Sequence, residues 1–160
     1  MTEQAIDLSA ITRSIVVNAP QQRCFETFTT GVDAWWPREH HLGESDLDRA
    51  MLEPREGGRW YERSVDGSEC DWGVVLAWEP PERVVLSWDI SPEWRYDPSA
   101  RTEVEVRFHA EGPSTTRVEL EHRGFERLGA EGGEQMRSAV GSDEGWGSGL
   151  QAFAKVAEAG

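Results

Sequence analysis

The fold is decided by residues 102–123, TEVEVRFHAEGPSTTRVELEHR, where apolar and charged residues alternate on both sides of a Gly112-Pro113 turn. Strict alternation is typical of β-strands, because successive side chains point to opposite faces of a sheet. One face is apolar and the other carries glutamate and arginine, which predicts antiparallel strands with one buried and one hydrated side. The predicted buried positions are Val104, Val106, Phe108, Val118, Leu120 and His122.

Five further strands are expected upstream of this hairpin, where β-branched and aromatic residues cluster between turn signals. The strongest of these signals is Asp66-Gly67, and Pro80-Pro81 separates the two longest segments. Residues 38–48 and 91–100 are polar and are expected to be loops. The predicted strands are 11–17, 49–53, 59–65, 69–79 and 83–90. Alternation in the last two predicts an inner face of Trp72, Val74, Leu76, Trp78, Val84, Leu86 and Trp88.

Helical signals follow the first strand and fill the tail. Asn18-Ala19-Pro20 predicts the start of a short helix with Asn18 as its N-cap, and residues 32–37 predict a second helical turn. Between residues 136 and 157 apolar residues recur at helical spacing, so one long C-terminal helix is expected. Gly141 is a candidate interruption, after which Ser142 would cap a second segment.

These signals together predict an α+β domain. A curved antiparallel sheet of about six or seven strands wraps around the long C-terminal helix, and two short helices follow the first strand. Residues 1–10 are polar and unpatterned, so we expect a flexible leader followed by a single domain over residues 11–160. Where helix and sheet separate along part of their length, a cavity forms between them.

The net charge of −14 results from 30 acidic residues against 16 basic ones. It disfavours nucleic acids and anionic membranes as partners, because basic patches are needed to neutralise phosphate. We expect no signal peptide, since no basic region precedes an apolar one, and no apolar run reaches the ~20 residues of a membrane span. Cys24 and Cys70 lack metal-binding spacing, and we expect two thiols in a reducing cytoplasm, with a single disulfide bridge as the alternative.

Motifs of catalytic and cofactor sites are missing from the sequence. It contains no GxSxG elbow, no P-loop and no dinucleotide fingerprint. His40-His41 lies near Glu39, Glu44 and Asp46, but adjacent histidines do not project to one side. A solvated loop is therefore expected there, and no metal or cofactor is predicted.

Eight tryptophans are the outlier of the composition. Several of them, with a phenylalanine and a histidine, are expected to face one another or to lie on lid segments. They are Trp72, Trp88, Phe108 and His122 on strands, Trp146 on the tail helix, and Trp36 and Trp94 on the lid segments. Such a set predicts an aromatic-lined pocket, whereas each member alone fits an ordinary core.

The order of several short motifs resembles that of the SRPBCC or START-like helix-grip superfamily, in the branch named after the activator of the heat-shock-ninety ATPase. The matching stretches are IVVNAP (15–20), WWP (35–37), GGRW (57–60), WGVVLAWEPPER (72–83), LSW (86–88), LEHRGF (120–125) and GWGSGL (145–150). The resemblance implies a deep pocket between sheet and helix for lipids, polyketides, hormones or other apolar molecules. It also implies that a minority of members are cyclases or hydrolases and that others are co-chaperone domains.

On this basis we expect a binding protein for a small hydrophobic or aromatic molecule. The expected ligand-binding residues are Trp36, Trp60, Trp72, Trp88, Trp94, Phe108, His122, Phe125 and Trp146. One alternative is a cyclase- or hydrolase-type enzyme that uses the same pocket, with His122 and Tyr61 in acid–base roles. Another is a co-chaperone-like interaction domain, which an exposed apolar patch on the outer sheet would favour. A homodimer or a chaperone contact remains a candidate partner.

Overall fold

The structure, a computed structural model, describes residues 7–160. The strands are β1 (Ile11–Val17), β2 (Leu47–Leu52), β3 (Arg59–Ser64), β4 (Glu69–Glu79), β5 (Arg83–Trp88), β6 (Thr102–Gly112) and β7 (Thr115–Arg123). The helices are α1 (Gln21–Phe28), η1 (Val32–Ala34), η2 (Pro98–Ala100), η3 (Phe125–Leu128), α2 (Gly129–Val140), η4 (Asp143–Gly147) and α3 (Ser148–Ala159). Most of the predicted leader, residues 1–6, lies outside the described residues.

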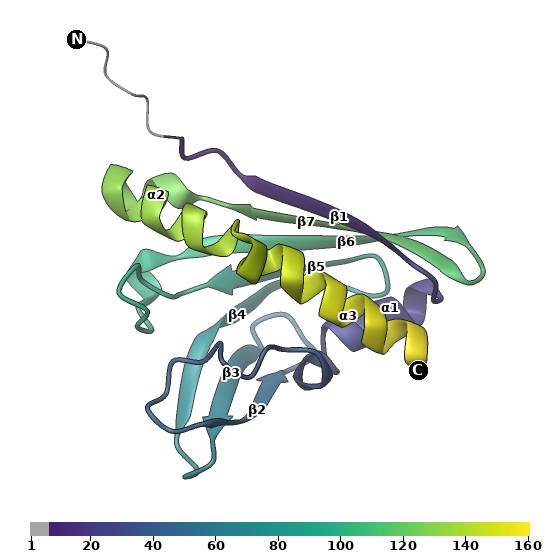
Figure 1. The fold of residues 1–160 in the computed structure, drawn as a ribbon, viewed down its shortest axis with the longest axis horizontal. Coiled ribbons are helices and arrows are strands. Elements are labelled where there is room, and N and C mark those ends of the chain that lie inside the picture. Colours follow the sequence, from purple (N-terminus) through teal and green to yellow (C-terminus); the bar gives the residue numbers. More distant parts are fainter. Residues whose placement is uncertain (1–6) are drawn as a thin grey trace.

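The strands form one antiparallel sheet in the order β1-β7-β6-β5-β4-β3-β2. Figure 1 shows α2 and α3 one after the other across a face of this sheet, with α1 beside α3. The two short helices α1 and η1 follow β1 as predicted. The α+β helix-grip architecture expected from the sequence is therefore confirmed.

The two faces of the sheet differ as alternation predicted. The inner residues of β6 and β7 are each no more than 2% exposed; they are Val104, Val106, Phe108, Val118, Leu120 and His122. On the outer face the carboxylate of Glu105 forms ion pairs with Arg83, Arg107 and Arg123. The sheet thus turns one apolar side toward the helices and one charged side toward water.

β4 departs from the predicted inner face of Trp72, Val74, Leu76 and Trp78. Trp72 and Val75 are buried, whereas Val74 and Leu76 are only partly buried. Two β-bulges cause the change, because Trp72 has no partner in β3 and Leu76 has none in β5. Each extra residue moves the residues after it to the opposite face.

Neither predicted helix cap is formed. α1 starts directly after Pro20, so the side chain of Asn18 is too far away to cap it, and the backbone N–H of Asn18 donates instead to the carboxylate of Glu158. The hydroxyl of Ser142 donates backward to the carbonyl of Ala139 at 2.8 Å, so it closes the end of α2 and does not cap the next segment.

The C-terminal helix is broken near the predicted position. α2 ends at Val140 and α3 begins at Ser148, and Gly145 between them has a non-helical backbone (φ −90°, ψ −128°). A Cβ at Gly145 would collide with the carbonyl of Val140, so the close approach of the chain at this break requires glycine. No helix within residues 7–160 is long and apolar enough to cross a membrane.

Candidate functional site

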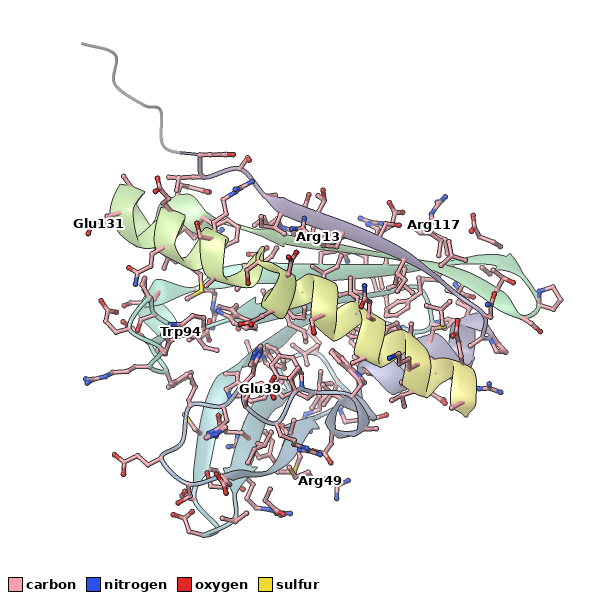
Figure 2. All side chains as sticks on the ribbon, in the orientation of Figure 1. Arg13, Glu39, Arg49, Trp94, Arg117 and Glu131 are labelled. Atoms are coloured by element: carbon pink, nitrogen blue, oxygen red, sulfur yellow. The ribbon has the colours of Figure 1, made fainter. Side chains whose placement is uncertain are left out.

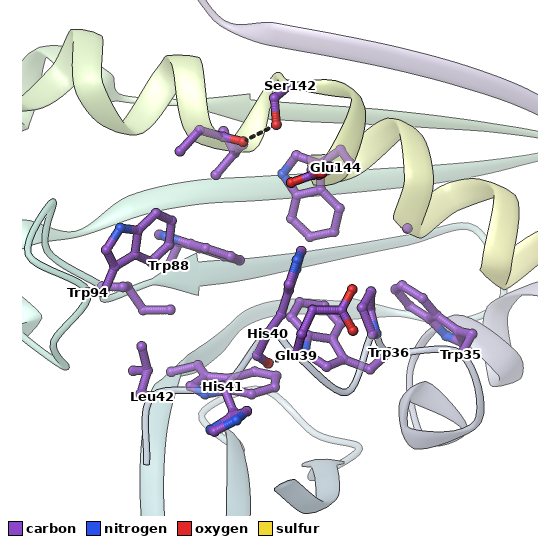
Figure 3. A pocket seen from close by; sticks show the side chains of 18 residues that line it. Trp35, Trp36, Glu39, His40, His41, Leu42, Trp88, Trp94, Ser142 and Glu144 are labelled. Atoms are coloured by element: carbon purple, nitrogen blue, oxygen red, sulfur yellow. Dashed lines mark hydrogen bonds between the residues drawn. The ribbon is translucent and has the colours of Figure 1, made fainter. Parts of the chain in front are cut away.

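A cavity of about 510 Å³ lies beneath the break between α2 and α3 (Figure 3). It is bounded by Trp72 of β4, by Trp88 at the end of β5, by the segment that follows η1, and by the loop after β5. Six indole rings line it: Trp35, Trp36, Trp72, Trp88, Trp94 and Trp146. Its size is within the range of small-molecule sites, roughly 300–1,000 Å³.

Several features of the backbone bring the indoles to the cavity. Trp72 occupies the first bulge of β4, and Trp88 is the last residue of β5. Trp146 is directed inward at the helix break, and Trp36 follows η1. Trp94 is in the left-handed conformation (φ 61°), which a bulky residue rarely adopts, and its side chain is nearly half exposed.

Five of the six rings, all except Trp94, form a connected wall. Trp36 contacts Trp72 with 4.8 Å between ring centroids, and it also meets the edge of Trp146 at 6.2 Å. Trp146 in turn lies 5.8 Å from Trp88. Such distances are typical of favourable aromatic pairs. The rings therefore support one another while leaving space on one side of the wall.

Hydrogen bonds hold most of these rings in place. The N–H of Trp36 donates to the carbonyl of His40 at 2.8 Å, and the N–H of Trp35 donates to the carbonyl of Thr27 at 2.9 Å. Because these N–H groups already have partners, the two rings offer a ligand only their apolar surfaces.

Glu62 joins the cavity wall to the loop that borders it. Its carboxylate is fully buried and accepts the backbone N–H groups of Leu42 at 2.5 Å and Gly43 at 3.0 Å. It also accepts the indole N–H of Trp72 at 2.8 Å. A buried carboxylate with three donors is well satisfied, so it fixes the positions of both the loop and the ring.

Polar side chains gather on the lining segments that are partly or fully exposed. They are Glu39, His40, His41, Ser142 and Glu144. In Figure 3 the ring of His40 points up into the space between Trp36 and Glu144. Figure 2 shows Glu39 and Trp94 below the C-terminal helices, while Arg13 and Arg117 lie on the opposite side. The cavity therefore has apolar walls and a polar opening.

Five of the nine predicted ligand-binding residues line the cavity: Trp36, Trp72, Trp88, Trp94 and Trp146. Trp60 lies behind Trp36 and Trp72, and its N–H donates to the carbonyl of Ser87 at 2.7 Å. Phe108 packs instead against Phe25 and Phe28 of α1. Trp60 and Phe108 therefore belong to the core.

His122 and Phe125 stack on each other 4.9 Å apart and do not line the cavity. The Nδ1 atom of His122 accepts the N–H of Trp146 at 3.0 Å, and Nε2 lies 2.8 Å from the hydroxyl of Thr102. Complete burial lowers the pKa of His122 to about 3. A neutral imidazole with both nitrogens occupied has no free position for a substrate.

Tyr61, the other predicted acid–base residue, lies outside the cavity lining, and the guanidinium of Arg59 stacks on its ring at 3.8 Å. The lining residues that sequence reasoning missed are Trp35, Pro37, Leu42, Ile90, Ala139, Val140, Ser142, Glu144, Gly145, Gly149 and the solvated-loop residues Glu39, His40 and His41. For the lining residues between 38 and 42, the available sequence signal was their position directly after Trp35-Trp36-Pro37. Within residues 7–160, no three His, Cys, Asp or Glu side chains converge as metal ligands would.

Comparisons with known proteins agree with this architecture. The family model described as Activator of Hsp90 ATPase homolog 1-like protein matches residues 18–158. The structure of an anthrahydroquino-γ-pyrone synthase, Txn09, is 35% identical, with 96% of this chain and 99% of that chain covered and a TM-score of 0.66. No curated protein matches the chain.

Two further structures are similar. CalC, a self-sacrificing resistance protein from Micromonospora echinospora, is 29% identical over 94% of this chain and 95% of its own, with a TM-score of 0.68. Protein NE0264 from Nitrosomonas europaea is 13% identical over 98% and 99%, with a TM-score of 0.67, and so shares the fold.

Proposed function

Because this chain belongs to the family of Activator of Hsp90 ATPase homolog 1-like proteins, we propose that it binds a flat, polycyclic aromatic small molecule in the cavity beneath the helix break. The observation that carries the proposal is the wall of six indole rings around about 510 Å³ of space. Flat aromatic ligands stack on such rings and remove apolar area from water, which contributes about 25 cal/mol per Å² before binding costs.

The similarity to Txn09 supports the same class of ligand. That protein is described as a synthase of an anthrahydroquino-γ-pyrone, a fused-ring aromatic compound, and it is 35% identical over nearly the whole chain. The cavity here has room for a molecule of three or four fused rings. The cytoplasm is the proposed site of action, since Cys24 and Cys70 both carry free thiols.

An enzyme of the ring-closing type is the second candidate function. It is favoured by the polar opening, where His40, Glu39 and Glu144 lie close to the space that the ligand would occupy. Proton transfer needs a titratable group within hydrogen-bond reach of the substrate. In this candidate function His40 and a neighbouring carboxylate take the acid–base roles, in place of His122 and Tyr61.

A co-chaperone-like function has less support. The outer sheet face carries ion pairs around Glu105, and the exposed large apolar residues of the described chain are few and lie on three separate segments, two of them together on the loop after β5. They are Val16, Val65, Trp94 and Tyr96. An interaction surface of the apolar kind would need a contiguous patch.

The proposal is tested by titrating the protein with 9,10-anthraquinone and with anthracene while tryptophan fluorescence is measured. We expect saturable quenching, because several indoles contact the ligand. The variant Ala139→Phe places a ring in the cavity from α2 and is expected to weaken binding at least about tenfold.

The matched control is Ser138→Phe, an exposed neighbour on the same helix that does not line the cavity. It is expected to leave the affinity unchanged. Absence of saturable quenching by both compounds would contradict the binding proposal.

The enzyme candidate is supported if ring closure is lost in His40→Ala while anthraquinone binding is retained, and it is contradicted if His40→Ala leaves turnover unchanged.

A further inference from the structure

The indole N–H of Trp88 is the exception among the buried cavity rings. Trp88 is only 6% exposed, and its Nε1 atom is buried with no hydrogen-bond acceptor in the described part of the chain. The N–H groups of Trp72 and Trp146, which lie on the same wall, donate to Glu62 and to His122. Among the buried indoles of the wall, the Trp88 donor is therefore the one without a partner in residues 7–160.

An unsatisfied buried donor destabilises a protein, so its position calls for an explanation. The surroundings prevent the Trp88 ring from turning to find an acceptor. It packs against His122 at 5.2 Å, Trp146 at 5.8 Å and Trp60 at 6.0 Å between ring centroids. The ring is thus held in an orientation in which its N–H meets no acceptor among residues 7–160.

The backbone beside Trp88 is fixed as well. The fully buried carboxylate of Asp89 forms two hydrogen bonds with the guanidinium of Arg101, at 2.8 and 3.0 Å. Such paired, charge-assisted bonds restrict geometry strongly. Binding sites typically combine apolar walls with a few fixed polar groups that orient the ligand.

Trp88 and Trp94 both line the cavity, from the end of β5 and from the loop that follows it. Figure 3 shows the nitrogen end of the Trp88 ring turned toward the ring of Trp94, and both residues line the cavity. Trp94 is nearly half exposed, so it is the neighbour with the most freedom to move. Because the Trp88 nitrogen itself is covered, contact with a ligand requires a neighbouring side chain to move, and the half-exposed Trp94 is the lining residue best placed to do so.

We propose that the Trp88 N–H donates a hydrogen bond to an oxygen atom of the ligand, so that the protein selects oxygenated polycyclic aromatics, such as quinones, over the parent hydrocarbons. This inference rests on the proposed function and specifies its ligand class. A carbonyl oxygen in the plane of a fused-ring system can accept this bond while the rings stack on the neighbouring indoles.

The test compares the dissociation constants of 9,10-anthraquinone and anthracene, which share their ring frame and differ in two oxygens. We expect the protein to bind anthraquinone about tenfold more tightly than anthracene, because one hydrogen bond to an otherwise unsatisfied donor contributes that much affinity. In Trp88→Phe this preference is lost. In the control Trp36→Phe, whose N–H already donates to His40, the affinities fall together and the preference remains.

A second measurement does not depend on any variant. In protein with ¹⁵N-labelled indoles, the Trp88 N–H signal, assigned from its nuclear Overhauser effects, is expected to shift on addition of anthraquinone and not of anthracene. Equal affinities for the two compounds, with the same Trp88 signal in both complexes, would overturn this inference and leave the proposed function standing. If neither compound binds, the proposed function fails and this inference fails with it.

Discussion

The imidazole of His122 accepts the Trp146 indole N–H at Nδ1 and faces the Thr102 hydroxyl with Nε2. An indole nitrogen only donates, so Nδ1 carries no proton and the single imidazole proton is on Nε2. The identity of a residue as histidine therefore does not decide whether it acts in catalysis or in packing. The same histidine that sequence patterning suggests as an acid–base group acts here as a neutral link between a helix and two strands.

We therefore predict that His122 stays neutral down to about pH 4. Burial lowers its pKa in the folded protein to about 3, against about 6.5 when unfolded. Below pH 6.5 the unfolded state binds a proton on His122 that the folded state does not. The free energy of unfolding is therefore unaffected by this group above pH 6.5 and falls by about 1.4 kcal/mol per pH unit toward pH 3. Imidazole ¹⁵N shifts check this, and urea unfolding of His122→Gln should show a weaker loss between pH 6.5 and 4. An NMR titration with a midpoint near pH 6 would refute it.

At the scale of elements, β3 organises a loop that belongs to no helix or strand. Glu62 projects from β3 and receives hydrogen bonds from the backbone of residues 42–43 and from Trp72 of β4. The break between α2 and α3 also positions a lining residue, because it directs Trp146 into the space that this loop borders. The cavity is thus formed where regular elements end.

We predict that Glu62→Gln destabilises the protein by about 2–3 kcal/mol, because an amide nitrogen would face donors that now meet a carboxylate oxygen. Release of the loop should also weaken anthraquinone binding. Urea unfolding and the fluorescence titration measure the two effects. The control is Glu69→Gln, which removes a half-exposed ion pair with Arg59 and should cost under about 0.5 kcal/mol. Equal effects of the two substitutions would show that Glu62 has no special role.

At the scale of the whole molecule, the sheet separates a charged outer face from an aromatic inner one. Burial alone would raise the pKa of Glu105, but hydrogen bonds from Arg123 and Arg83 outweigh it and lower the pKa to about 2. The net charge of −14 adds general repulsion, yet here carboxylates and guanidiniums are interleaved across the three strands β5, β6 and β7. The outer face therefore stabilises the sheet that shapes the cavity.

We predict that Glu105→Gln lowers the free energy of unfolding at pH 7 by about 2–3 kcal/mol. A carboxyl whose folded pKa is depressed stabilises above its unfolded pKa, so this contribution declines as pH falls from about 4.5 to 2. Chemical denaturation of both proteins at several pH values should show their difference shrinking in that window. The exposed Glu111→Gln is the control. A difference that stays constant down to pH 3 would disprove the assignment.

The sequence by itself determined the strands, the two short helices and the helical tail, because alternation, helical spacing and turn residues are local properties. It offered Gly141 only as a candidate interruption of that tail, and the tertiary structure decided that the helix breaks there. The tertiary structure alone decided which inward aromatic residues face a cavity. Trp60, Phe108 and His122 match the inward pattern as well as Trp72 does, but other contacts place them in the core: Trp60 lies behind two indoles, Phe108 packs on α1, and His122 stacks on Phe125. That choice depends on contacts between residues distant in the chain, such as Glu62 with the loop before β2, and no local pattern contains them.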